Sequence, residues 1–333
     1  MRLSFSGIFP FLCLAAGLAG CESNGDGFLG PTAPPVPPSL LTFLPDDGSR
    51  VEPGTTISAA AGAEDGIGGA RTSALNQAYH EAGLRQTASG FTLTLERRSA
   101  SPNPFVATFG ALSAGSGDLA GFGVASTTDV TRSGTALTDA RAILQDGSVA
   151  TPLAFMTFAY WAVFNSTWDT IYTAAGGAIG TPAADLSAGA SLGTARYTGV
   201  TVGGMVDVMT AGNYSTLRGN IAITANFTTN VLGADITNLQ LADPFTGVNR
   251  QAGPNISFAG ATIRDAGGTA SPGFQGSSGV GSFTAALDGI PLGAGEFADI
   301  AGTFYGANLQ EVGGAWYLVT PSIEASGTFG AAR

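Results

Sequence analysis

The stretch Leu217-Arg-Gly-Asn-Ile-Ala-Ile-Thr-Ala-Asn-Phe227 decides the fold class of this chain. Apolar or small residues occupy its odd-numbered positions, and mostly polar ones, such as Arg218 and Asn220, occupy the even-numbered positions. A period of two is typical of a β-strand with one buried and one solvated face. The stretch therefore predicts a strand of an antiparallel sheet that covers a core on one side only.

Runs of the same kind continue on both sides of this strand, with short Gly-, Asn- and Ser-rich turns between them. The eight predicted strands are 195–207, 217–227, 231–239, 255–263, 280–287, 297–305, 315–320 and 323–329. No segment with helical periodicity interrupts them, which argues against a parallel α/β sheet. Closing eight strands into a ring removes the exposed edges of an open sheet. We therefore predict an eight-stranded antiparallel up-and-down β-barrel over 190–333, in a mainly β protein.

The region 46–185 is less regular and predicts a small β-rich domain with one short helix. Alternating apolar and polar residues over 91–95 predict a strand. The segment 73–84 places Leu75, Tyr79 and Ala82 at helical spacing behind a serine that can cap a helix, so it predicts the helix. The small residues of 176–193 predict a linker to the barrel.

The N-terminus has the layout of a bacterial lipoprotein signal. Residues 1–20 combine Arg2 with a short apolar core, and Leu18-Ala-Gly-Cys21 places two small residues before a cysteine. This predicts cleavage before Cys21 and attachment of a lipid to its thiol; an ordinary signal peptide is the alternative. The apolar run is too short for a spanning helix. The Gly/Asp- and then Pro-rich segment 21–45 predicts a tether between the membrane and the folded domains.

Charge and cysteine content exclude several classes of function. The net charge is −11, so binding to nucleic acid or anionic lipid through net charge is not expected. The chain has two cysteines. Loss of Cys13 with the signal and acylation of Cys21 leave no thiol for a disulfide, a metal or catalysis.

Catalytic chemistry finds little support in the sequence. His80 is the one histidine of a chain that has no lysine, so imidazole or amine catalysis has few candidates. Carboxylates such as Glu296 and Asp299 are more typical of solvated turns than of a glycosidase pair. We predict that the protein is not an enzyme, with catalysis as a distant alternative.

Two aromatic pairs are candidate ligand-binding residues. Tyr79 and His80 are residue types that ligate haem iron, and the alternative is an ordinary surface position. Tyr160 and Trp161 would form a stacking surface or a protein-binding hot spot if exposed. Their more common role is in the core of the domain. No cofactor is required by the sequence, and haem is the one considered.

The stretch Gly302-Thr-Phe-Tyr-Gly-Ala-Asn-Leu-Gln-Glu-Val-Gly-Gly-Ala-Trp316 predicts a barrel hairpin. Phe304 and Tyr305 would end one strand on opposite faces, with one helical turn over 307–311 before the next strand. Glu311 then accepts hydrogen bonds from backbone N–H groups left unpaired at this corner. We interpret Glu311 as a structural carboxylate.

Several segments resemble the lipoprotein barrel of the transferrin-binding protein B family over about 195–333. The first half contributes Tyr197-Thr-Gly199, Leu217-Arg-Gly219, Ile223-Thr-Ala-Asn-Phe227, Val231-Leu-Gly233 and Ile236-Thr-Asn-Leu239. The positions that carry the resemblance in the second half are Gly302, Phe304, Tyr305, Gly306, Glu311, Gly313, Gly314, Phe329 and Gly330. Phe158-Ala-Tyr-Trp161 is similar to an aromatic segment of the domain that precedes this barrel.

The resemblance implies a surface lipoprotein in which a "handle" domain, here 46–185, precedes the barrel. Members capture host iron proteins, haem carriers or complement regulators, and some reach the surface through an outer-membrane translocator. We therefore expect a protein lipid-anchored to the outer membrane of a Gram-negative bacterium, on the cell surface. Its handle and barrel-rim loops would bind an iron- or haem-related ligand or a protein partner. The chain has one handle-plus-barrel unit where transferrin receptors have two, so transferrin as ligand does not carry over. The alternative is a structural or adhesive envelope lipoprotein.

Overall fold

The computed structural model divides the chain into two units, Met1–Pro35 and Val36–Arg333. The residues it describes all belong to the second unit. They are 63–65, 71–73, 80–87, 90–97, 105–132, 135–136, 139–145, 153–164, 171–180, 182–207, 213–242, 249–265 and 272–333. The predicted signal, Cys21 and the predicted tether lie outside them. No helix in these described ranges is both long and apolar enough to cross a membrane.

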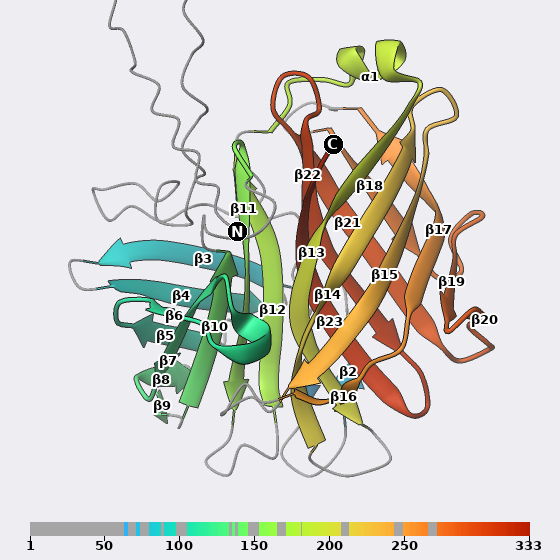
Figure 1. Cartoon of the computed structure of the whole chain (residues 1–333). Helices are drawn as coiled ribbons and strands as arrows, with labels where there is room; N and C mark the ends of the chain where they lie inside the picture. The colour runs from blue at the N-terminus through green and yellow to red at the C-terminus, as the bar shows by residue number, and fades with distance from the viewer. Residues whose placement is uncertain are drawn as a thin grey trace, which may run out of the picture. The chain divides into compact units, whose positions relative to one another are not determined.

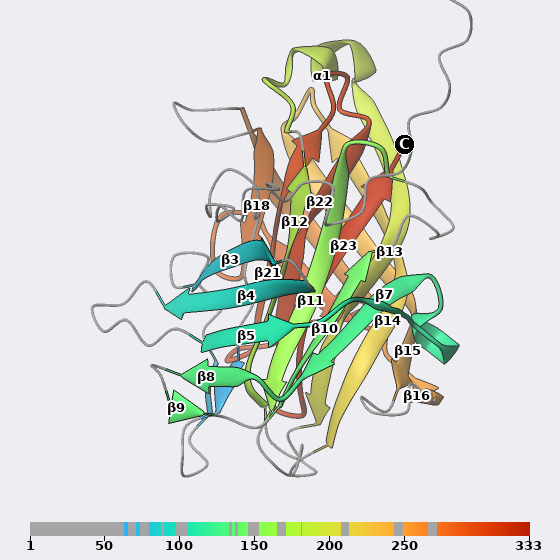
Figure 2. The ribbon, with the colours of Figure 1, turned by 90° about the vertical axis from the view of Figure 1, so that its left-hand side faces the viewer.

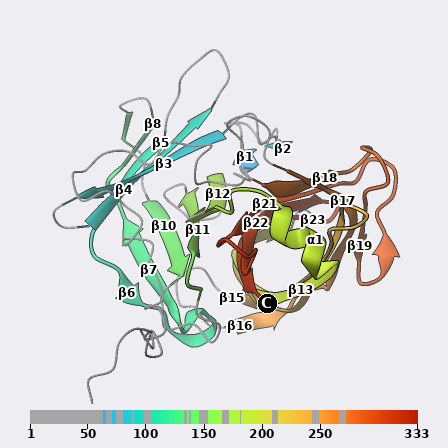
Figure 3. The same ribbon diagram turned by 90° about the horizontal axis from the view of Figure 1, so that it is seen from above.

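Eight antiparallel strands close into a barrel (Figures 1 and 3). They are β13 (Thr194–Asp207), β14 (Asn213–Asn226), β15 (Val231–Ala242), β17 (Ile256–Arg264), β18 (Gly273–Ser277), β21 (Phe297–Tyr305), β22 (Glu311–Val319) and β23 (Ile323–Ala332). Each strand pairs with the next along the chain, and β23 pairs with β13 to close the ring. The predicted up-and-down barrel is confirmed. In the stretch 217–227, the side chains at positions 217, 221, 223 and 225 are fully buried, as its alternation predicts.

The fifth barrel strand differs from the prediction. It is β18 and not 280–287, where β19 (Thr284–Leu287) and β20 (Ile290–Pro291) form a hairpin on the side of the barrel. β17 pairs with β19 through Ile256–Ala259 and with β18 through Thr262–Arg264. Gly260, at a φ of 81°, lies between these two pairings. β18 was missed because its five residues include two glycines and are too few to show alternation.

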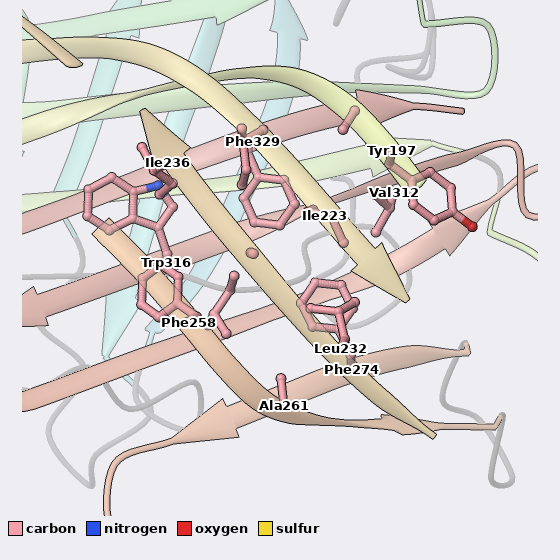
Figure 4. Packing of buried hydrophobic residues seen from close by; sticks show 14 of the residues in the cluster. Tyr197, Ile223, Leu232, Ile236, Phe258, Ala261, Phe274, Val312, Trp316 and Phe329 are labelled. Carbon is pink, nitrogen blue, oxygen red and sulfur yellow. The ribbon is translucent and has the colours of Figure 1, made fainter. Parts of the chain in front are cut away.

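The barrel interior is filled with side chains, as expected for eight strands. Figure 4 shows side chains of several barrel strands, aromatic rings among them, packed in the buried cluster. The ring of Phe258 lies 6.4 Å from Trp316 and 6.3 Å from Phe283, between ring centroids. The indole N–H of Trp316 donates to Thr201 Oγ1 at 2.8 Å, so its polar atom is satisfied inside the barrel. The interior is therefore a packed core.

One end of the barrel is covered by α1 (Ser187–Leu192), seen above the ring in Figure 3. Leu186 and Leu192 pack against the barrel core. The N–H of Leu186 donates to Asp265 Oδ1 at 3.1 Å, which ties the helix to the end of β17. α1 lies within the predicted linker 176–193, whose first residues belong instead to a strand of the handle.

Beside the eight barrel strands, β16 (Asn249–Ala252) pairs with β15, and the strands β1 to β12 are called the handle here. One sheet has the order β12-β11-β10-β7-β6 and the other β3-β4-β5-β8-β9 (Figure 2). The first contains β6 (Ser113–Ala114), β7 (Phe122–Thr127), β10 (Asp139–Gln145), β11 (Met156–Phe164) and β12 (Ile171–Gly180). The second contains β3 (His80–Thr87), β4 (Gly90–Arg97), β5 (Phe105–Phe109), β8 (Val130–Arg132) and β9 (Thr135–Ala136), and β1 (Ala63–Asp65) pairs with β2 (Arg71–Ser73).

The helix predicted over 73–84 is wrong. Ser73 ends β2, and His80–Thr87 is a strand that pairs with β4 from His80↔Arg97 to Thr87↔Gly90; residues 74–79 lie outside the described ranges. An eight-residue antiparallel pairing supplies cross-strand main-chain hydrogen bonds, which outweigh a weak local helical spacing. In the part of the chain that the structure describes, the α-helix is α1, at the end of the barrel.

Candidate functional site

The segment at the start of β11 packs against three glycines of the barrel, two on its outer wall and one in the turn after β21. They are Gly306, Gly313 and Gly330, named here the docking face. A Cβ at Gly330 would lie 2.6 Å from Leu153 Cδ1 and from the Phe158 ring, and one at Gly306 would lie 2.9 Å from the Phe155 ring. At Gly313 it would lie 2.6 Å from Met156 Sδ. Handle side chains therefore lie directly on the barrel backbone, which no larger residue would permit.

Glu311 joins the same segment to the barrel by hydrogen bonds. The Ala154 N–H donates to its Oε1 at 2.5 Å and the Phe155 N–H to its Oε2 at 2.9 Å, and Met156 N–H adds a third bond. The side chain is 3% exposed. Burial raises the pKa of the carboxyl group, and the three N–H donors partly oppose that rise. The donors belong to the handle and not to the barrel corner where we expected them.

The turn that precedes Glu311 is held at several points. It is not a helical turn: Gly306 and Leu309 have positive φ values of 74° and 55°, and the Leu309 N–H donates to Gly306 O at 3.0 Å. The hydroxyl of Tyr197 donates to Leu309 O at 2.9 Å from inside the barrel. Arg333, the last residue, donates from its N–H to Gln310 O at 3.0 Å. The geometry of the Glu311 contact is therefore fixed from the barrel side.

Buried tyrosines form a second connection between handle and barrel. The Tyr160 hydroxyl lies 3.2 Å from Ser326 Oγ on β23, and it also bonds to Tyr214 on β14. Burial raises the pKa of Tyr160 to about 12, against the lowering effect of these two hydrogen bonds. The Tyr214 ring lies over Gly204 of β13, where a Cβ would overlap it. Both tyrosines therefore remain neutral hydrogen-bonding groups at physiological pH.

The predicted ligand-binding residues are placed as follows. Tyr160 is 2% exposed and Trp161 is 5% exposed. Tyr160 packs in the core shared with the barrel, and Trp161, its neighbour on the strand, points to the other face. Core packing accounts for Tyr160, whereas Trp161 is buried on the other face of β11 and its indole N–H has no hydrogen-bond partner among the described residues. His80 is the first residue of β3, whereas its side chain and the whole of Tyr79 lie outside the description, as does Cys21.

The remaining polar groups of the described residues were compared with the ligand sets of metal sites. No group of three or more His, Cys, Asp and Glu residues that would hold a metal occurs within the described ranges. Asp299 is half-buried on the outer wall, and burial raises its pKa to about 6 against a hydrogen bond from Ser277. The glycine contacts and the 154–156 donors were missed by sequence reasoning, because the sequence does not specify which segment covers each face.

This arrangement defines a handle-plus-barrel protein, in which a two-sheet domain packs on the wall of a closed eight-stranded barrel. Two solved structures of transferrin-binding protein B are similar to it. The isotype 1 protein from serogroup B Neisseria meningitidis is 15% identical, with a TM-score of 0.35, over 79% of this chain and 51% of that one. A variant of the vaccine antigen from Haemophilus parasuis Hp5 is 12% identical, with a TM-score of 0.37, over 87% of this chain and 64% of that one.

The chain thus spans between half and two thirds of these proteins. Both structures belong to the family that the sequence resembles. No family model matches the chain, and no curated protein matches it.

Proposed function

We propose that the protein is a lipid-anchored binding protein of the Gram-negative cell surface, and not an enzyme. It would capture an iron- or haem-related ligand or a protein partner through loops of the handle and the barrel rim. The observation that carries this proposal is the packed barrel interior, where aromatic rings fill the axis and Trp316 donates to Thr201. A filled barrel leaves the loops as the part that can vary and bind, presented on a rigid scaffold.

The anchor rests on the sequence around Cys21. Cys21→Ala should leave the precursor uncleaved and free of lipid, and should move the protein out of the membrane fraction. Protease treatment of intact cells tests the orientation. Digestion of the wild type in intact cells supports surface display and the use of an outer-membrane translocator. Protection until the outer membrane is permeabilised would place the protein in the periplasm.

The ligand is tested with the mature chain as bait. A pull-down from host fluids and culture medium should recover a specific partner. Excess free mature chain should compete with the immobilised bait for that partner. A protein that is displayed but recovers nothing would support the structural or adhesive alternative.

Haem is tested separately by titration. If haem binds at Tyr79 and His80, titration should shift its Soret band, and His80→Ala should weaken the affinity for haem at least tenfold. A shift that His80→Ala leaves unchanged would remove this pair as the haem site.

A further inference from the structure

We propose that the backbone at 154–156 is a carboxylate-binding site, and that the chain fills this site with its own Glu311. The handle would then be latched to the barrel by a bound anion. Consecutive main-chain N–H groups that converge on one point form a known type of anion site. Here Ala154 and Phe155 donate to different oxygens of the same carboxylate, at 2.5 and 2.9 Å, so both oxygens are engaged.

All the donors that contact Glu311 in these hydrogen bonds are main-chain groups. Met156 N–H joins the other two, and the site therefore needs no basic side chain. This suits a chain that contains no lysine. The carboxylate is also taken out of water, because Glu311 is 3% exposed. A charged group in such a place requires hydrogen-bond donors at its oxygens, and these N–H groups supply them.

The donor segment is shaped by contacts other than Glu311. Met156 pairs with Gly180 of β12, where a Cβ would lie 2.7 Å from Met156 Cα. The Phe155 ring packs at Gly306, and Leu153 packs at Gly330. Since these contacts come from the handle sheet and from glycine backbone, the N–H groups should keep their direction when the Glu311 side chain is shortened. The site is therefore separable from its occupant.

Small carboxylates are the class of ligand that this site would accept. Glu311→Ala removes the carboxylate together with one CH2 group, and formate or acetate matches the volume and charge that are lost. The inference does not rest on the proposed binding function, because it concerns a contact between two parts of one chain.

The test is chemical rescue of Glu311→Ala at pH 7. The variant should melt several degrees below the wild type, and its Tm should rise with formate or acetate but not with chloride at equal ionic strength. The matched control is Glu324→Ala. Glu324 is a buried carboxylate that accepts from a side-chain donor, the Tyr317 hydroxyl, at 2.9 Å, so formate should raise the Tm of this variant less than that of Glu311→Ala.

A second readout locates the anion. Formate should shift the amide proton resonances of Ala154, Phe155 and Met156 in Glu311→Ala, and leave them unchanged in the wild type, where the site is filled. If Glu311→Ala does not fold in chloride, its refolding yield in formate replaces the Tm. A variant whose Tm or refolding yield responds equally to formate and chloride, with no shift at these amides, would overturn the proposal.

Discussion

At the scale of single residues, the glycines of the docking face matter because they have no side chain. Each lies where a handle side chain meets the barrel backbone, and the added Cβ would overlap that side chain. Gly204 plays the same part for Tyr214, whose ring crosses β13 to reach Tyr160. The resemblance in the sequence therefore includes residues whose physical role is close approach between two domains.

Gly330→Ala should destabilise the protein by about 1–3 kcal/mol, the usual cost of overpacking a well-packed core. The new methyl group meets Leu153 and Phe158, both buried, and neither has a free direction in which to move. Urea unfolding measures the loss. The matched control is Gly110→Ala, an exposed glycine with no atom within 4 Å of the added methyl, which should change stability by less than about 1 kcal/mol. Equal effects of the two substitutions would contradict this account.

Asp299 should make stability depend on pH in weak acid. Its carboxyl group binds a proton more tightly in the folded protein, because burial raises its pKa from 3.8 to about 6. The free energy of unfolding contributed by this group therefore falls as the pH rises between these two values, and is constant above them. Asp299→Asn should remove this part of the pH dependence. The measurement is the difference in free energy of unfolding between variant and wild type, from urea unfolding at pH 4 to pH 7. A difference that stays constant over this pH range would refute the prediction.

At the scale of elements, the strands with sustained alternation were predictable and the irregular ones were not. β14 alternates over its whole length, so its period of two identified both the strand and its buried face. β18 is short, and the neighbouring apolar run 280–287 competed with it for the same place in the barrel. β3 was predicted as helix because three apolar residues at helical spacing outweighed its pairing with β4, which the sequence does not reveal.

The join between β17, β18 and β19 depends on Phe283. Its ring is buried, stacks on Phe258 and occupies the space that a side chain at Gly276 would take. Phe283→Ala should cost about 3 kcal/mol, at the lower end for buried aromatic truncation. Hydrogen exchange should also become faster in the β19–β20 hairpin. Ile290→Ala is the control, because Ile290 is 71% exposed in the same hairpin and should change stability by less than about 0.5 kcal/mol.

At the scale of the whole molecule, the unit Val36–Arg333 has a core that its two domains share. One hydrophobic cluster contains Phe158 and Tyr160 of the handle together with Val202 and Tyr305 of the barrel wall. Glu311 and the docking face lie beside this cluster on the barrel wall. Because neither side of the cluster is buried without the other, the stability of the handle should depend on the barrel.

This shared core predicts that handle and barrel unfold in one transition. The calorimetric and van't Hoff enthalpies of the wild type should agree. Phe158→Ala should weaken the shared core more than the barrel interior, so that hydrogen exchange becomes faster in β11 than in β22. Two separate transitions in the wild type, or equal acceleration in both strands, would contradict the prediction.

The sequence alone determined most of the barrel strands and the closed barrel, because a period of two identifies the side chains that share one face of a strand. Tertiary structure alone decided what covers each face. The Ala154 N–H and the Glu311 carboxylate are 157 positions apart, and Tyr160 and Ser326 are 166 apart. No local pattern encodes such pairs, since they are selected by the fit of two surfaces and by the need of buried polar groups for partners. The sequence therefore allowed Glu311 to be interpreted as a structural carboxylate, but it did not identify the N–H groups that donate to it.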